Sequence, residues 1–366
     1  MAHRVHCFNP GPAQLPLPVL EAVQAEMLDF NGSGMSVMEL SHRSPEYATV
    51  HAEAKQDFKD LLGLGDNWHI LFLPGGSSTQ FFHLPNNILN GSGKADYVST
   101  GSWSKKAIKE AKRFGDIHVA HDAANADGQF LYIPKQDELN LRPDAKYLHI
   151  TTNNTIAGTQ WHTLPTPPKG VWLAADMCSD LFWRKFDFEP FGMFYASAQK
   201  NMGPAGVTIV AIRDEFLALC SDDVPTMVSY KVQADKDSLF NTGPTFPIYV
   251  VGKVLKWLKG LGGLDVMEQM NTEKATMLYD ALDARPDYWM TSVRKDSRSY
   301  MNAVWRIKND ENLEKKFVTE AKAAGLVGLK GHRSVGGIRA SIYNAVSKDG
   351  VRKLIDFMEA FAKANP

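Results

Sequence analysis

The fold of this chain is decided by residues 193–212, MFYASAQKNMGPAGVTIVAI. Two apolar runs, 193–198 and 207–212, flank Lys200 and a turn rich in glycine and proline. Apolar runs of this length between turn residues are typical of buried β-strands. A lysine at the end of a buried strand has a lowered pKa, which favours the neutral amine that attacks carbonyl carbons. We therefore predict a reactive amine at the edge of a sheet.

A carboxylate follows another apolar run in the same way. Residues 171–175 lead directly into Asp176, upstream of Lys200. A Schiff-base amine and a carboxylate for a pyridinium nitrogen are the protein groups that pyridoxal phosphate chemistry most requires. The pair predicts a pyridoxal phosphate site with Lys200 and Asp176 as its catalytic residues. The ordinary alternatives are that Asp176 caps the next segment and that Lys200 is a solvated loop lysine.

Strand and helix patterns alternate through the first two thirds of the chain. Such alternation is typical of a largely parallel sheet that helices cover on both faces. We expect strands at 69–73, 95–99, 118–120, 147–151, 171–175, 191–196 and 207–212, and helices at 18–30, 47–62, 79–89 and 105–114. The sequence therefore predicts an α/β protein whose large domain has a mostly parallel, seven-stranded sheet flanked by helices.

The most marked break in the pattern follows an expected helix at 247–261, where Gly262-Gly263 interrupts the chain. Beyond it we expect helix 264–282, strand 300–307, helix 313–324, strand 337–343 and helix 348–364, the last capped by Ser347. We predict a large domain over 16–262 and a smaller α+β domain formed by 1–15 and 263–366.

Three more polar segments follow expected strands. The loop Gly75-Gly76-Ser77-Ser78 precedes a helix, Trp103 starts another helix, and Thr155 lies in a polar loop. Each has an ordinary alternative as a capping turn, a core aromatic residue or a capping threonine. Carboxyl ends of parallel strands share one edge of a sheet, so we expect these groups to gather around the amine and the carboxylate.

Composition narrows the classes of function. The formal net charge of −1 gives no overall attraction to nucleic acid or to an anionic membrane. Cys7, Cys178 and Cys220 are too few and too scattered for a disulfide framework or a zinc site, so we expect no metal. The first residues lack the apolar core of a signal peptide, and no apolar stretch approaches the length of a membrane span. These features predict a cytoplasmic protein without membrane or nucleic-acid partners.

Five longer segments carry a family resemblance. They are FNPGPA (8–13), SVMELSHR (36–43), ASAQKNMGPAG (196–206), FNTGPTF (240–246) and GHRSVGGIRASIYN (331–344). Together they resemble the phosphoserine aminotransferases, which are class V, fold type I pyridoxal phosphate enzymes, over about residues 8–360. The resemblance implies a homodimer with shared active sites that transfers the amino group of L-glutamate to 3-phosphohydroxypyruvate, giving O-phospho-L-serine and 2-oxoglutarate. It also allows 4-phosphohydroxythreonine as a product in pyridoxine synthesis.

The resemblance also implies roles for individual residues at the cofactor. It assigns the Schiff base to Lys200, the pyridine nitrogen to Asp176, ring stacking to Trp103, the phenolate oxygen to Thr155, and the cofactor phosphate to Ser77, Ser78 and Gln199 with Asn241 and Thr242 of the other subunit. The cofactor phosphate would therefore be bound by both subunits.

A substrate that carries both a phosphate and a carboxylate needs several cations, among which arginine is preferred for its bidentate geometry. Arg339 lies inside an expected strand, where a solvated surface arginine is less expected. The resemblance assigns Arg339 to the α-carboxylate. It assigns His42, Arg43, His332 and Arg333 to the distal phosphate or carboxylate, partly across the dimer.

Two positions depart from the family pattern. Ser78 stands where the family often has an arginine, and Gly243 stands where a proline is common. Two other functions stay open at this point: another class V aminotransferase, such as an alanine–glyoxylate type, and a non-catalytic protein that binds phosphate ligands. A cysteine desulfurase is disfavoured because no cysteine follows Cys220.

Overall fold

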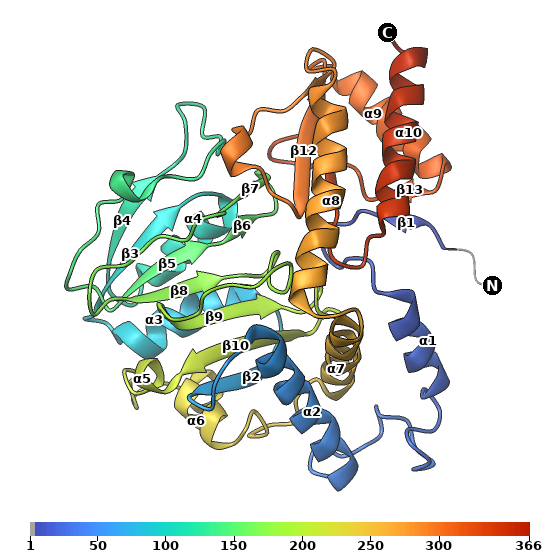
Figure 1. Cartoon of the computed structure of the whole chain (residues 1–366). Coiled ribbons are helices and arrows are strands. Elements are labelled where there is room, and N and C mark those ends of the chain that lie inside the picture. The colour runs from blue at the N-terminus through green and yellow to red at the C-terminus, as the bar shows by residue number, and fades with distance from the viewer. Residues whose placement is uncertain (1–3) are drawn as a thin grey trace.

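A seven-stranded sheet runs through the middle of the molecule (Figure 1). The structure is a computed structural model and describes residues 4–366, so residues 1–3 of the predicted small domain lie outside the described residues. The strands lie in the order β2-β10-β9-β8-β5-β3-β4, and only β10 is antiparallel to its neighbours. Their bounds are β2 Trp68–Pro74, β3 Lys94–Ser99, β4 Asp116–Asp122, β5 Tyr147–Thr151, β8 Trp172–Asp176, β9 Phe191–Ser197 and β10 Val207–Arg213. The predicted mostly parallel, seven-stranded sheet is confirmed.

Helices cover both faces of the sheet, so β5, β9 and β10 are buried along their whole length. Alternate residues of β2 show this, because Ile70 and Phe72 pack in one hydrophobic cluster and Leu71 and Leu73 in another. The first cluster includes residues of α2 (Pro45–Leu62) and α7 (Thr245–Gly260), and the second includes residues of α3 (Gln80–Leu89) and α4 (Ser102–Ala111). This arrangement leaves the strand ends free to carry polar groups.

The first predicted helix is shorter than expected. The helix α1 spans Leu17–Ala25, whereas the apolar pattern predicted 18–30. The chain turns instead, with positive φ at Asn31 and Gly32 and with the carboxylate of Asp29 accepting from the backbone N–H of Gly34 (2.8 Å). An aspartate that bonds to nearby backbone competes with helix formation.

The C-terminal part has a hydrophobic cluster of its own, separate from the two clusters on the central sheet, and includes a three-stranded sheet (Figure 1). Its elements are α8 Leu264–Asp283, β11 Trp289–Met290, β12 Asn302–Ile307, α9 Glu311–Ala323, β13 Leu326–Val327, β14 Ile338–Ser341 and α10 Lys348–Ala364. The side chain of Ser347 accepts from Gly350 N–H, so the predicted cap is confirmed.

The N-terminal segment packs into this C-terminal cluster. Strand β1 (His6–Cys7) pairs in parallel with β13, and Phe8 is fully buried among C-terminal side chains. The division into domains at 262–263 stays a prediction, which the separate clusters support. The sequence did not predict the short elements β1, β6 Asn153–Asn154, β7 Thr159–Gln160, β11, β13, α5 Asp214–Leu217 and α6 Tyr230–Asp235.

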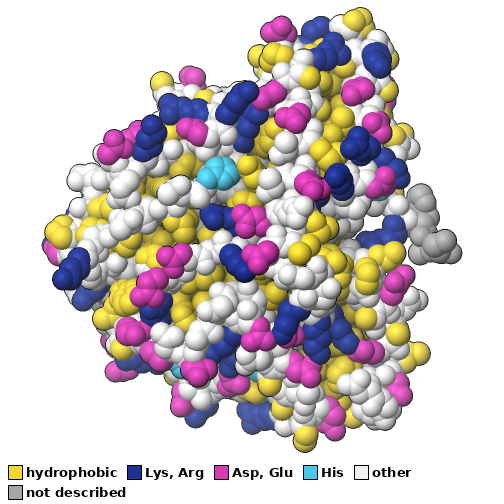
Figure 2. All heavy atoms as spheres, in the orientation of Figure 1, with side chains coloured by type: hydrophobic (Ala, Val, Ile, Leu, Met, Phe, Trp, Pro, Cys, Tyr) yellow, Lys and Arg dark blue, Asp and Glu magenta, His cyan; other side chains and the backbone are white. Residues whose placement is uncertain are grey.

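Positive and negative side chains are interspersed over the face in Figure 2, as a nearly neutral chain predicts. None of the helices within residues 4–366 is long and apolar enough to cross a membrane. The same residues contain no group of three or more His, Cys, Asp or Glu side chains placed to hold a metal ion.

Candidate active site

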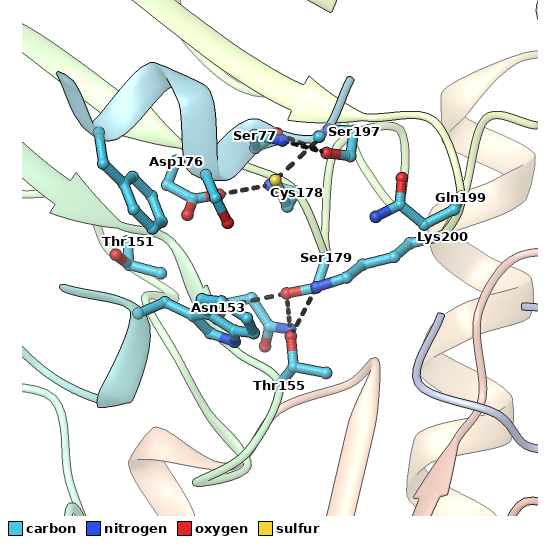
Figure 3. Close-up of a pocket in the computed structure, with 14 residues that line it drawn as sticks. Ser77, Thr151, Asn153, Thr155, Asp176, Cys178, Ser179, Ser197, Gln199 and Lys200 are labelled. Atoms are coloured by element: carbon cyan, nitrogen blue, oxygen red, sulfur yellow. Dashed lines mark hydrogen bonds between the residues drawn. The ribbon is translucent and has the colours of Figure 1, made fainter. Parts of the chain in front are cut away.

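A pocket lies at the carboxyl edge of the central sheet (Figure 3). It encloses about 480 Å³ of atom-free space, including the part that is continuous with solvent. The lining residues are Gly76, Ser77, Ser78, Phe81, Trp103, Thr151, Asn153, Thr155, Asp176, Cys178, Ser179, Ser197, Gln199 and Lys200. The strand ends therefore bring together every residue that the sequence placed at the cofactor from within one chain.

Lys200 follows β9 in the short connection to β10, and its amine is hydrogen-bonded to a neutral hydroxyl group. Its Nζ donates to Thr155 Oγ1 at 2.9 Å. The side chain is half-buried rather than buried, which corrects the expectation from the apolar strand, because the pocket is open beside it. On its other side, a Cβ added at Gly11 would lie 3.3 Å from Lys200 Cγ. The N-terminal segment thus packs against the lysine.

Asp176 is the last residue of β8 and is 5% exposed. One carboxylate oxygen accepts from Cys178 N–H at 3.0 Å. Burial raises the pKa of Asp176, while the Cys178 hydrogen bonds and the positive charge of Lys200 oppose that rise. The carboxylate makes no ion pair with any residue between 4 and 366. A buried carboxylate in a pocket wall, without a cation of its own, is suited to a protonated ring nitrogen.

The loop after β2 forms one wall of the pocket. Ser77 N–H donates to Ser197 Oγ, and the two hydroxyl oxygens are also 2.7 Å apart. Ser197 was not predicted as a site residue, although it lies in the segment that leads to Lys200. Ser77 starts the turn of 3-10 helix, Ser77–Thr79, that leads into α3, and the start of a helix suits a phosphate. Ser77 and Ser78 both line the pocket there.

Two buried polar atoms in the pocket wall have no hydrogen-bond partner among residues 4–366: Trp103 Nε1 and Thr151 Oγ1. Buried polar atoms are normally satisfied, so these two suit a polar ligand. With the carboxylate, the amine and the serine loop, the donor set fits pyridoxal phosphate.

Sequence reasoning missed a buried carboxylate next in the chain to Ser179, which lines the pocket. Asp180 accepts from the side chains of Thr152 and Gln160, and burial raises its pKa to about 7. Gln160 in turn accepts from Tyr300 N–H at 2.9 Å. Thr155 lies in the loop between β6 and β7, and this network supports that hairpin. Its members are distant in sequence, so no local pattern could have revealed it.

Arg339 joins the C-terminal sheet to Thr155, one of the residues that line the pocket. It lies in β14, is 6% exposed, and donates to the carbonyl oxygen of Thr155 at 3.2 Å. Its Nε is buried without a partner, and the guanidinium makes no ion pair with the part of the chain described. Burial lowers the pKa of Arg339. Thr155 therefore contacts both Lys200 and Arg339, one through its hydroxyl and the other through its carbonyl.

None of the predicted substrate residues lines the pocket of a single chain, and only Arg339 among them is hydrogen-bonded to a lining residue within residues 4–366. Burial lowers the pKa of His332, and the positive charges of Arg339, Arg333 and Lys106 lower it further. His332 therefore lies close to three cationic side chains. Arg43 is exposed and donates to His42.

The loop residues expected to bind the cofactor phosphate of another subunit also lie outside the pocket. Asn241 donates only to the carbonyl of Thr242, its neighbour. Their roles across a dimer stay predictions.

The fold and the pocket are those of a class V aminotransferase, whose family model matches residues 5–354. Solved and curated relatives narrow this class. A phosphoserine aminotransferase of Desulfosudis oleivorans is 51% identical, with 100% of both chains covered. The solved phosphoserine aminotransferase of Bacillus circulans subsp. alkalophilus has a TM-score of 0.96 and 46% identity, with 100% of both chains covered. The solved enzyme of Trichomonas vaginalis, described as bound to pyridoxal phosphate, has a TM-score of 0.92 and 36% identity, covering 97% of this chain and 100% of its own. The chain belongs to the phosphoserine aminotransferase family.

Proposed function

We propose that this protein is a pyridoxal phosphate-dependent phosphoserine aminotransferase. It transfers the amino group of L-glutamate to 3-phosphohydroxypyruvate and releases 2-oxoglutarate and O-phospho-L-serine. The observation that carries the proposal is the shared contact at Thr155, a pocket residue whose hydroxyl accepts from the Lys200 amine and whose carbonyl accepts from the Arg339 guanidinium. An α-amino acid presents an α-carbon and a carboxylate one bond apart, which is the pair of groups that such an arrangement can hold.

The cofactor would be held by residues of the pocket wall. Asp176 would face the ring nitrogen, Trp103 would stack on the ring, and Ser77, Ser78 and Gln199 would bind the phosphate. When bound, pyridoxal phosphate supplies an electron-accepting ring and a carbonyl carbon that carries the amino group between substrates. Asp176 keeps a proton on the ring nitrogen, because a carboxylate buried beside that nitrogen favours its cationic form.

Lys200 is the proton carrier at the substrate α-carbon. Its Nζ takes the α-proton in one direction and returns it in the other as general base and general acid. Thr155 orients this amine through the hydrogen bond from Nζ to its hydroxyl. The half-buried position allows the side chain to swing away from its resting contact when substrate enters.

Arg339 binds the substrate α-carboxylate, because a buried guanidinium without an anionic partner is ready for a bidentate contact. His332 and Arg333 bind the distal phosphate or carboxylate. His42 and Arg43 reach the same group from the other subunit, and Asn241 and Thr242 of that subunit complete the cofactor phosphate site. The active form is accordingly a homodimer, and we place it in the cytoplasm. 4-Phosphohydroxythreonine is proposed as a second product, serving pyridoxine synthesis.

A coupled assay tests this function. The purified protein, loaded with pyridoxal phosphate, is given glutamate with 3-phosphohydroxypyruvate, and in parallel alanine with glyoxylate. We expect 2-oxoglutarate to form rapidly in the first mixture and little product in the second. The Lys200→Ala variant should lose both turnover and the visible absorbance of the bound cofactor. Faster turnover of alanine with glyoxylate would contradict the proposed substrate.

A further inference from the structure

A set of buried polar side chains joins the turn that carries Lys200 to the segment that follows Arg339. We call Asn201, Asn271, Lys274 and Asn344 the amide clamp. Asn271 and Lys274 lie one turn apart on α8, the long helix beside β12 in Figure 1. Asn201 is the chain neighbour of Lys200, and Asn344 lies shortly after β14.

Lys274 is the lysine of the clamp and is 1% exposed. Burial lowers its pKa to about 7, whereas three hydrogen-bond acceptors around its nitrogen favour the ammonium form, which has three N–H donors. Its ammonium group donates to three backbone carbonyl oxygens, those of Ile342 (3.1 Å), Tyr343 (2.8 Å) and Val346 (2.9 Å). No carboxylate within residues 4–366 pairs with it. Burying an ammonium without a counter-ion is costly, and an apolar side chain would fill the same space without that cost. Because the ammonium group donates to three carbonyl oxygens of residues 342–346, it fixes the backbone path of that segment.

Asn344 lies inside that fixed segment and links three parts of the chain. Its N–H donates to Asn201 Oδ1 at 3.1 Å, and its Nδ2 donates to the carbonyl of Phe182 at 3.0 Å. Its Oδ1 accepts from Asn271 Nδ2 at 2.9 Å. Asn201 also donates to the carbonyl of Leu181 at 3.0 Å. The connection therefore runs from Lys274 through 342–346 to Asn344, and from there to the residue beside Lys200.

The two ends of this connection carry the groups proposed to act on adjacent parts of one substrate, its α-carbon and its α-carboxylate. β14 positions Arg339, and the segment held by Lys274 begins directly after that strand. We propose that Lys274 is a positioning residue for transamination, and that its ammonium group sets the distance between the Lys200 amine and the Arg339 guanidinium through Asn344 and Asn201. This inference rests on the proposed function, because it takes an α-amino acid as the ligand of both groups. A displacement of about 1 Å at such a site reduces the rate by up to about a hundredfold.

The test compares Lys274→Met, Asn344→Ala and the double variant, each as holoenzyme. The readout is the half-reaction with glutamate, followed by the absorbance change of the bound cofactor and normalised to cofactor content. We expect each single variant to react with saturating glutamate about tenfold more slowly while retaining cofactor absorbance. The double variant should lose little more than either single variant, because both changes break one connection. Lys316→Met, which removes a lysine of α9 outside the clamp, should behave as wild type.

Three outcomes overturn the inference. The first is an unchanged rate of the glutamate half-reaction in Lys274→Met, and the second is additive losses in the double variant. If Lys274→Met does not fold, Asn344→Ala decides, since it leaves the ammonium and its acceptors in place; an unchanged rate there is the third. Wild-type protein that reacts with glutamate but not with 3-phosphohydroxypyruvate contradicts the proposed function alone, because the clamp test uses only glutamate.

Discussion

Replacing Arg339 with leucine separates a substrate-binding arginine from a structural one. Arg339 is 6% exposed, and its guanidinium donates once to the Thr155 carbonyl and makes no ion pair within residues 4–366. A structural arginine in such a place would normally have an anionic partner. Arg339→Leu should therefore leave the free energy of unfolding within about 1 kcal/mol of wild type, because the lost hydrogen bond is offset by the removal of a buried unpaired charge.

The effect on the substrate should be much larger. A bidentate, charge-assisted contact with a carboxylate contributes about 3 kcal/mol, allowing for about 1.5 kcal/mol in each of two hydrogen bonds. Since 1.4 kcal/mol corresponds to a factor of ten, kcat/KM for glutamate should fall about a hundredfold. Arg339→Lys keeps the charge but not the fork, so its loss should be about tenfold.

The measurement is steady-state saturation with glutamate, accompanied by thermal melting and by the absorbance of the bound cofactor. Arg352→Leu, which removes an exposed arginine of α10, is the matched control. Unchanged glutamate saturation in Arg339→Leu would refute the carboxylate role. A large fall in melting temperature together with lost cofactor would show instead that the arginine is structural.

Three further outcomes are expected. Asp176→Asn should reduce turnover by at least about a hundredfold while the fold is retained, because the amide no longer favours a protonated ring nitrogen; wild-type turnover would exclude that role. Asp180 has a pKa of about 7 in the folded protein and about 4 when unfolded. Between these pH values the folded state binds more protons than the unfolded state, so the wild-type free energy of unfolding falls as pH rises from about 4 to 7. Urea titrations should show this fall in wild type and a smaller one in Asp180→Asn, and identical pH dependence of the two proteins would contradict the buried-carboxylate reasoning. Ser347→Ala should lower the free energy of unfolding by about 1 kcal/mol through loss of the α10 cap, compared in urea with Thr319→Ala, whose hydroxyl caps no helix.

Apolar patterning predicted most of the fold because both faces of the sheet are covered. Every residue of β9 and of β10 is buried, so each strand appears in the sequence as an apolar run bounded by turn residues. The apolar pattern could not predict that β10 lies between β2 and β9 and runs antiparallel to both. An apolar run has the same composition in either direction, and the short connection through Lys200 sets the direction only once the chain has folded.

The sequence by itself determined the residues that meet at the carboxyl edge, because Ser77, Trp103, Thr155, Asp176 and Lys200 each follow a strand and parallel strands end together. Only the tertiary structure decided which of these groups touch. It placed Thr155 between the Lys200 amine and the Arg339 guanidinium, which come from distant parts of the chain. It also decided which polar groups are buried without a counter-charge, because burial depends on packing across the whole molecule and not on the neighbours of a residue in the sequence.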